Sequence, residues 1–567
     1  IYHSDLIVVG APEASTADTG NANFQKTDAY YRSQKNYNNF KNGSDCGGPC
    51  GNRTEVIIGG ANNGILHAFK TSDGEELWGY IPPVLHGNFE RIPSSKANST
   101  NPIYGIDGSP VVKDVYIDDT PDDNTTNPRW RTVLISGIGA GGHGIFALDI
   151  TDINNPKHLF AIENDASNKA IKYWDADGLK SEFGYRGGAG INPQYNYRKL
   201  GETWSTPKII RIKVDGKDKW VAVFGGGYNQ AVNPNYGSAV FVMDIEDEGR
   251  LLKVIDIEDK SNQSYGWTGK LFKRVGGVLV DGNTKLQVKG SGQLPQMCFD
   301  SSKGESFTAE FTPSVGFTLH FYIGSGSKDC LDYVKFDEAW PNTRWGGPPK
   351  PDYGNFFFRR MSNDIVNSLP ADLSVITADG TDKANYDGAI VYATDLEGKL
   401  TKVNLTENFS LICPSGKTCN KDTDKVIKNI SATTLFIAES TSENGRYIYT
   451  RPEVTINNDN NLWLYFGTGN TQKLHEQSNK IKNRAYGIKD KDFPNYVNIS
   501  TPGDIRRCKT APACPGTTDL GWYANLPRAQ KLTAEPTVDK NRVYFPIYEP
   551  TTSTNACNTG KAILTAY

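Results

Sequence analysis

Residues Val56–Phe69 read Val-Ile-Ile-Gly-Gly-Ala-Asn-Asn-Gly-Ile-Leu-His-Ala-Phe, which is an apolar run, a Gly/Asn turn and a second apolar run. This strand-turn-strand phrase recurs along the chain, and its first three copies lie roughly 80 residues apart. A gap of that size suits one sheet per copy, so the repeat predicts an all-β chain folded as a β-propeller. The variants lie at 132–149, 221–244, 390–404, 462–470 and 542–547.

The composition favours strands over helices. The 567 residues include 28 Tyr, 24 Phe and 57 Gly but only 3 Met, and this usage is typical of pleated strands joined by tight turns. The net charge of −3 argues against a nucleic-acid groove, which carries a basic footprint. No apolar run approaches the ~20 residues that cross a bilayer, so we expect no transmembrane segment in this fragment. Because the chain starts abruptly at Ile1 and stops inside an apolar run, we expect residues 1–567 to be a fragment of a longer protein.

Nine cysteines fall mostly into pairs. Three pairs lie four to six residues apart in loops rich in Gly, Pro, Lys and Thr, and a fourth pair is more widely spaced. The chain has neither the two C-x-x-C pairs nor the nearby His that a zinc site needs. We therefore expect disulfides formed in an oxidising compartment. The pairs are Cys46 and Cys50, Cys298 and Cys330, Cys413 and Cys419, and Cys508 and Cys514, with Cys557 left over.

The repeat is interrupted over residues 270–355. This stretch has strand-like runs of its own at 277–280 and 317–322, and it ends in a Trp-Gly-Gly-Pro-Pro loop at 345–349. We interpret it as a small β-rich insertion between blades, where loops on a rigid scaffold are free to carry recognition. Residues 1–45 are polar, and we expect them to wrap the surface or to complete a blade.

Motifs for catalysis are weak. Residues Gly137–Gly142 match G-x-G-x-x-G, but a dinucleotide site needs a helix to start there, and residues 145–150 read as another strand. We therefore expect a glycine-rich hairpin turn. The seven His are scattered and indicate no Ser/His/Asp or Cys/His arrangement. The sequence predicts a protein that is not an enzyme.

The best chemical cluster is the loop Asp379-Gly-Thr-Asp-Lys-Ala-Asn-Tyr-Asp387, which lies just before the strand-like run 390–393. Calcium prefers several hard oxygens supplied by alternate residues of a tight loop. Lys383 would offer only its backbone carbonyl, because an ammonium has no lone pair. A solvated acidic turn is the alternative interpretation. The candidate calcium ligands are Asp379, Thr381, Asp382, Lys383, Asn385 and Asp387.

Residues Phe69–Trp78 resemble the blade phrase of quinoprotein propellers, in which a Trp after a tight turn docks between blades. Enzymes of that class that use pyrroloquinoline quinone typically also have two adjacent cysteines, and no two cysteines are adjacent in this chain. The resemblance therefore implies a modified quinoprotein-like β-propeller without the enzyme's activity.

Several phrases in a fixed order resemble the C-terminal domain of the PilC/PilY family of type IV pilus-associated adhesins. The style is most similar to the neisserial PilC branch. The resemblance implies that residues 1–567 are the C-terminal β-propeller domain of a longer protein, with about seven blades. It also implies a calcium loop immediately before the strand at 392–395, which is where Asp379–Asp387 lies. The phrases are Gly59–Phe69, Tyr104–Pro110, Thr132–Ile135, Gly141–Thr151 and Tyr392–Leu400.

The resemblance also implies a function. Such a protein would take part in pilus biogenesis, regulate pilus extension against retraction and attach the bacterium to host cells. Its partners would be the pilus, through minor pilins or the pilus tip, and a host-cell surface receptor. It would pass through the periplasm to the outer membrane, the cell surface and the pilus tip. Calcium would neutralise the crowded aspartates and order the loop for a partner. A periplasmic dehydrogenase of the pyrroloquinoline-quinone type and a non-adhesive envelope scaffold are the alternatives.

Overall fold

Most of the regular structure in the described part of the chain is β-sheet, which confirms the predicted all-β class. Its α-helices are short, and none of those described is long and apolar enough to cross a membrane. They are α1 (Asp28–Gln34), α2 (Tyr37–Lys41) and α3 (His86–Phe89). The computed structural model describes all residues except 1–2, 18–23, 90–102, 119–127, 185–192, 230–235, 258–266, 276–277, 289–297, 300–304, 313–317, 325–328, 338–356, 359–367, 380–383, 413–425, 428–429, 439, 441–443, 458, 460, 495–505, 508–519, 528 and 552–558.

Six mainly antiparallel sheets follow one another in the described residues, and the strands of each sheet are nearly consecutive in sequence. The first contains β1 (Ile7–Val9), β2 (Val56–Gly60), β3 (Leu66–Lys70) and β4 (Glu76–Tyr80). The second contains β5 (Pro110–Ile117), β6 (Arg129–Gly137), β7 (Gly144–Asp149), β8 (Lys157–Asp165), β9 (Ala170–Asp175) and β10 (Gly178–Gly184). The third contains β11 (Lys208–Val214), β12 (Lys217–Gly225), β13 (Ala239–Asp244), β14 (Leu251–Asp256) and the added β25 (Asn408–Phe409).

The second half of the chain continues the series. The fourth sheet contains β22 (Ser374–Thr377), β23 (Ala389–Thr394), β24 (Lys399–Leu405) and β28 (Ser431–Ile437). The fifth contains β29 (Glu453–Ile456), β30 (Leu462–Gly467), β31 (Arg484–Asp490), β33 (Gly521–Asn525) and the added β32 (Arg506–Arg507). The sixth contains β34 (Lys531–Leu532), β35 (Thr537–Asp539), β36 (Arg542–Glu549) and β37 (Lys561–Ala566). A separate pair is formed by β26 (Leu411–Ile412) and β27 (Val426–Ile427).

The inner strands of these sheets are buried on both faces, because alternate residues pack against two different neighbours. In β23, Val391 and Ala393 join the core shared with the third sheet, whereas Ile390 and Tyr392 join the core shared with the fifth. Shared cores join each sheet to the next, from the first to the sixth. Face-to-face packing of successive sheets is the architecture of a β-propeller. The predicted fold is therefore confirmed, and the described residues contain six blades, where the resemblance implies about seven.

Two local predictions are also confirmed. Gly137 ends β6 and Gly144 begins β7, so the glycine-rich motif between them is a hairpin turn. Trp78 of β4 donates its Nε1–H to the backbone oxygen of Ile153 at 2.8 Å. Since Ile153 belongs to the connection between β7 and β8, the Trp docks the first blade on the second.

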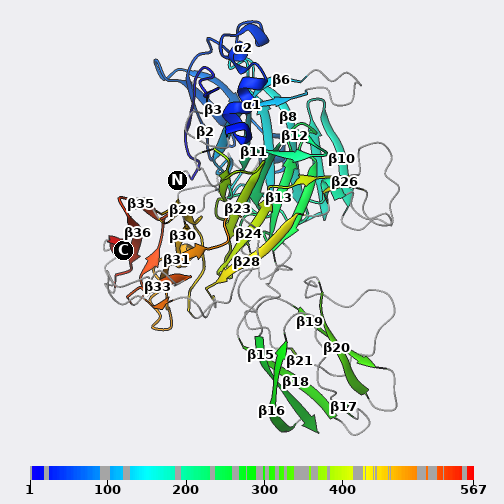
Figure 1. Ribbon diagram of the computed structural model, residues 1–567. Helices are drawn as coiled ribbons and strands as arrows, with labels where there is room; N and C mark the ends of the chain where they lie inside the picture. The colour runs from blue at the N-terminus through cyan, green and yellow to red at the C-terminus, as the bar shows by residue number, and fades with distance from the viewer. Residues whose placement is uncertain are drawn as a thin grey trace.

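The connections between antiparallel strands alternate between the two ends of a blade. Helices α1 and α2 belong to the connection from β1 to β2, and residues 378–388 form the equivalent connection from β22 to β23. Both connections therefore lie at one end of the propeller, which we call the helix end. The connection from β14 to β22 and the turn from β23 to β24 belong to the opposite end, which we call the insertion end. Figure 1 shows α1 and α2 at the top and the strands between β14 and β22 at the bottom.

The connection from β14 to β22 contains seven strands in the described residues. They form two sheets of their own, in the orders β16-β15-β18-β21 and β17-β20-β19. The register of β17 and β20 places Cys298 directly opposite Cys330, which were predicted as partners. The strands are β15 (Trp267–Val275), β16 (Val278–Val288), β17 (Cys298–Phe299), β18 (Glu305–Thr312), β19 (Thr318–Gly324), β20 (Asp329–Asp337) and β21 (Phe357–Phe358).

The turn from β23 to β24 holds the propeller residues on both sides of this insertion. The backbone N–H of Leu396 donates to Ser368 O at 3.0 Å, and the Lys399 ammonium donates to Ile257 O at 3.3 Å. The same ammonium lies 3.6 Å from Asp395 Oδ2 and 3.3 Å from Glu397 Oε2. The side chains of Asp395 and Lys399 are each 1% exposed. Burial raises the pKa of Asp395 to about 7, although Lys399 acts in the opposite direction.

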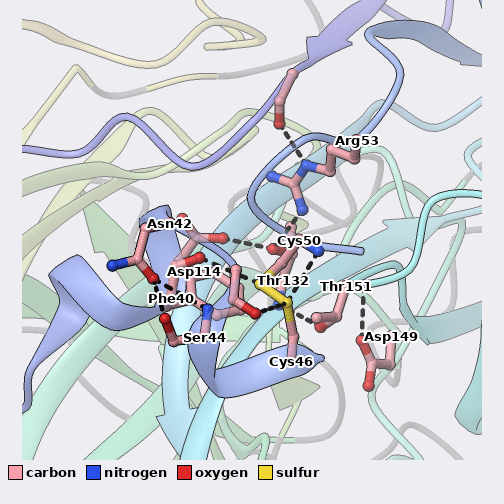
Figure 2. Close-up of a disulfide and its surroundings, with 12 residues drawn as sticks. Phe40, Asn42, Ser44, Cys46, Cys50, Arg53, Asp114, Thr132, Asp149 and Thr151 are labelled. Atoms are coloured by element: carbon pink, nitrogen blue, oxygen red, sulfur yellow. Dashed lines mark hydrogen bonds between the residues drawn. A yellow bond between two sulfur atoms is a disulfide. The ribbon is translucent and has the colours of Figure 1, made fainter. Parts of the chain in front are cut away.

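The predicted Cys46–Cys50 disulfide closes a short loop at the end of the N-terminal segment, and Cys50 is buried in the core shared by the second and third blades. Figure 2 shows the disulfide beside Thr132 of β6, with Arg53 close by. The Arg53 guanidinium donates to Thr132 Oγ1 at 2.7 Å. Residues 1–45 were expected to wrap the surface or to complete a blade. They do both, because β1 completes the first blade and the two helices lie over the blades. The other cysteines predicted to pair, Cys413, Cys419, Cys508 and Cys514, lie outside the described residues, as does Cys557.

Candidate cation site at the helix end

The predicted calcium loop connects the first two strands of the fourth blade, β22 and β23. Its end is fixed by Tyr386, whose hydroxyl donates to Ile376 O at 3.0 Å. Gly388 follows with φ +88, and a Cβ at this position would lie 2.0 Å from Leu405 O, so only glycine fits. The chain therefore enters β23 in one defined direction directly after Asp387.

The structure describes three of the six predicted ligands, and two of them meet the N-terminal segment. Asp379 accepts from the backbone N–H of Asp28, at 3.1 Å to Oδ1 and 3.2 Å to Oδ2. Asp387 Oδ2 accepts from the Lys26 ammonium at 3.0 Å. Asn385 is exposed. The remaining predicted ligands, Thr381, Asp382 and Lys383, lie outside the described residues.

The contacting segment is the beginning of helix α1. Thr27 is its N-cap, and its side-chain oxygen accepts from the N–H of Tyr30 at 3.1 Å. Lys26 lies just before the cap, and Asp28 is the first helical residue. The Asp379 carboxylate therefore accepts from one of the N–H groups that the first turn of a helix leaves without a helical partner.

Asp28 is itself part of a charged cluster from two further blades. Its carboxylate accepts from Lys113 Nζ of β5 at 2.9 Å and from Arg211 Nε of β11 at 3.2 Å. The Arg211 guanidinium also lies over the Tyr31 ring, 4.5 Å from the centroid. Burial acts to raise the pKa of Asp28, but Lys113 and Arg211 outweigh it, and the pKa lies below its ordinary value. The start of α1 is thus tied to the second and third blades as well as to the loop of the fourth.

The described residues bring two carboxylates to this junction. The two carboxylates at the ends of the loop converge on residues 26–28, where one takes an ammonium and the other an N–H. Carboxylate oxygens spaced along a short loop are ligands that calcium prefers. Among the described residues, no group of three or more His, Cys, Asp and Glu side chains could hold a metal ion. A calcium site would therefore draw its further donors from the predicted ligands at 381–383.

The sequence did not reveal the contribution of Lys26, Asp28, Lys113 and Arg211. A local signal existed for the helix start, because Thr followed by Asp is typical of an N-cap and first turn. No local signal linked that start to a loop that lies 361 residues further along the chain. Only the arrangement of the blades brings the two segments together.

Comparison with known proteins finds similarity to PilY1 proteins. A family model described as the PilY1 beta-propeller domain matches residues 13–271, a range that includes Lys26, Asp28, Lys113 and Arg211. The type IV pilus biogenesis factor PilY1 homolog of Xylella fastidiosa (strain Temecula1 / ATCC 700964) is 23% identical over 532 residues, which cover 89% of this chain and 25% of that protein. The type IV pilus biogenesis factor PilY1 of Pseudomonas aeruginosa (strain UCBPP-PA14) is 27% identical over 230 residues, which cover 41% of this chain and 15% of that protein.

The match thus spans a quarter or less of the length of these relatives. Among solved structures, the crystal structure of the Pseudomonas aeruginosa PilY1 C-terminal domain matches 96% of this chain and 83% of that chain. The sequence identity of that match is 17% and the TM-score is 0.48.

Proposed function

We propose that the chain is a member of the PilY1/PilC family of type IV pilus proteins and that it is the propeller domain of a pilus biogenesis factor that responds to calcium. The observation that carries the proposal is the match of residues 13–271 to the PilY1 propeller model. Relatives that match the chain are named type IV pilus biogenesis factors. The domain acts by binding, without catalysing a reaction.

Calcium is the proposed ligand of the loop Asp379–Asp387. Support comes from the two carboxylates that converge on one short segment and from the cationic partner that Asp387 takes. When bound, calcium supplies two positive charges that the loop's carboxylates neutralise. Asp379 and Asp387 would hold it, and Asn385 could add a side-chain oxygen. Ordering of this loop would then set how the helix end meets a partner.

We further propose that the whole protein regulates pilus extension against retraction and attaches the bacterium to host cells. The partner at the pilus would be a minor pilin or the pilus tip, and the partner on the host would be a surface receptor. The protein would act at the outer membrane, the cell surface and the pilus tip after passage through the periplasm. These finer roles rest on the resemblance to pilus-associated adhesins.

The test replaces Asp387 with Asn in the whole protein, in a bacterium that depends on it for pili. We expect the purified variant to lose about one calcium per chain, because one of the carboxylate ligands of the loop becomes a neutral amide. Pilus number, twitching and attachment to epithelial cells should change together. The measurements are metal content by mass spectrometry, pilus counts, twitching zones and adherent bacteria.

The matched control is Asp177→Asn, which removes the same charge from a side chain that is 84% exposed. It should keep wild-type calcium content and wild-type pili. If Asp387→Asn keeps its calcium and gives a wild-type phenotype, the calcium assignment is wrong. If calcium is lost while pili and attachment stay normal, calcium binding is separate from pilus function.

A further inference from the structure

We propose that Lys26 is a tethered competitor of calcium at Asp387, so that the metal and the Lys26 ammonium exclude each other from the same carboxylate. This inference rests on the calcium site proposed above and names how that site is regulated. Lys26 would set the calcium affinity of the loop, and calcium binding would release Lys26 to solvent.

The first step is the geometry of the pair. The Lys26 ammonium lies 3.0 Å from Asp387 Oδ2, which is hydrogen-bonding distance. Calcium would need an oxygen of the same carboxylate at about 2.3–2.6 Å. A divalent ion at that distance would strongly repel a cation that is about 3 Å from the same oxygen. In the arrangement that the structure shows, the two cations therefore compete for this carboxylate.

The second step is the ease of exchange. The Lys26 side chain is 41% exposed and that of Asp387 is 17% exposed. Solvent screens an ion pair at this depth, and such a pair shifts an equilibrium by up to about five-fold. That is strong enough to weaken calcium binding measurably. It is also weak enough for calcium to displace the ammonium at a modest excess.

The third step is what stays in place when Lys26 leaves. Tyr31, Tyr37 and Phe40 of the two N-terminal helices are buried in the core shared by the second and third blades. Asp28 is held separately by Lys113 and Arg211. Lys26 lies before the N-cap, on a flexible four-carbon stem. Calcium would thus move one side chain while α1 remains docked, and the contact can switch without unfolding the segment.

The test measures calcium affinity by isothermal titration of the full chain in four forms: wild type, Lys26→Ala, Lys26→Arg and Lys41→Ala. Lys41, on α2, is the control for loss of one positive charge, because Lys26 contacts the loop and, among the described residues, Lys41 makes no ion pair with it. We expect Lys26→Ala to lower the calcium Kd about two- to five-fold. Lys26→Arg and Lys41→Ala should stay within two-fold of wild type.

A second measurement on the wild type needs no substitution. The rate at which an amine-reactive reagent acylates Lys26, followed by mass spectrometry of its peptide, should rise when calcium is added, whereas the rate at Lys41 should not change. Suppose that wild type and Lys26→Ala bind calcium with equal affinity and that calcium leaves the acylation rate of Lys26 unchanged. The competitor role of Lys26 is then overturned, while the calcium site itself stands. If no form binds calcium, the calcium site itself is wrong, and this inference is overturned with it.

Discussion

The two ends of strand β23 carry the same pair of chemical groups in opposite surroundings. Before the strand, Asp387 pairs with Lys26, which comes from 361 residues earlier in the chain. After the strand, Asp395 pairs with Lys399, only four residues away. The first pair is half-exposed, with side chains 17% and 41% exposed, whereas both side chains of the second are 1% exposed.

This difference separates an exchangeable contact from a structural one. At the helix end, water can solvate either charge if the pair opens, so another cation can take the place of Lys26. At the insertion end, opening the pair would leave a charge buried without its partner, and that penalty keeps Lys399 in place. The same aspartate–lysine chemistry therefore suits ligand exchange at one end of β23 and the anchoring of the insertion at the other.

The largest expected effect comes from breaking the buried pair. Lys399→Met keeps most of the side-chain volume and leaves Asp395 and Glu397 without their shared ammonium. We expect the free energy of unfolding to fall by about 3–5 kcal/mol at pH 8, measured by urea denaturation. Lys26→Met is the matched control and should lose about 1 kcal/mol or less. Equal losses in the two variants would remove the distinction between the two ends of β23.

The second prediction concerns pH at the insertion end. Burial raises the pKa of Asp395 to about 7 in the folded chain, against about 3.9 for an unfolded aspartate. The folded state binds this proton more tightly, so its contribution to stability is complete below pH ~4 and is lost as the pH rises to ~7. Asp395→Asn should therefore gain stability relative to wild type between pH 5 and pH 8, by on the order of 2 kcal/mol.

The measurement for Asp395 is chemical denaturation at several pH values between 5 and 8. Asp177→Asn, at an exposed position, should run parallel to wild type over this range. If Asp395→Asn also runs parallel to wild type, then Lys399 holds the Asp395 carboxyl ionised at every pH tested.

The smallest effect is expected at the helix end, at Asp28. Lys113 and Arg211 keep the pKa of Asp28 below its ordinary value despite burial, so its contribution to stability is present above pH ~4 and is lost as the pH falls through the folded pKa. Asp28→Asn should lower the free energy of unfolding by about 1–2 kcal/mol at pH 7. The loss should shrink when unfolding is followed at pH 3. A constant loss at both pH values would mean that packing, and not charge, gives Asp28 its effect.

The sequence predicted the fold well because the middle strands of each blade are buried on both faces. In the first blade, the second and third strands are Val56–Gly60 and Leu66–Lys70, and in the fourth blade they are Ala389–Thr394 and Lys399–Leu405. Each pair consists of two apolar runs around a tight turn, a pattern that can be recognised in the sequence alone. The first and fourth strands are often shorter or more polar, as β1 and β4 are. They are correspondingly harder to recognise.

The candidate site was predicted only in its local part. Asp379, Asn385 and Asp387 lie in one loop, so their spacing could suggest a cation. Lys26 and Asp28 belong to another segment, and their part in the site depends on how the first and fourth blades are arranged. The burial of Asp395 and Lys399 could not be predicted from the sequence either, because the Leu-Glu-Gly-Lys turn has the composition of a solvent-exposed turn. Burial of a charged pair follows from neighbouring blades that no local pattern describes.

The separation of Lys26 from Asp387 also has a consequence for biosynthesis. A ribosome makes the chain from its N-terminus, at about 5–20 residues per second. After Lys26, the chain must grow by another 361 residues before Asp387 is made. By then the strands of the first two blades, β11–β14 of the third blade and the insertion have been translated. Formation of this ion pair would report that the fourth blade has packed beside the third.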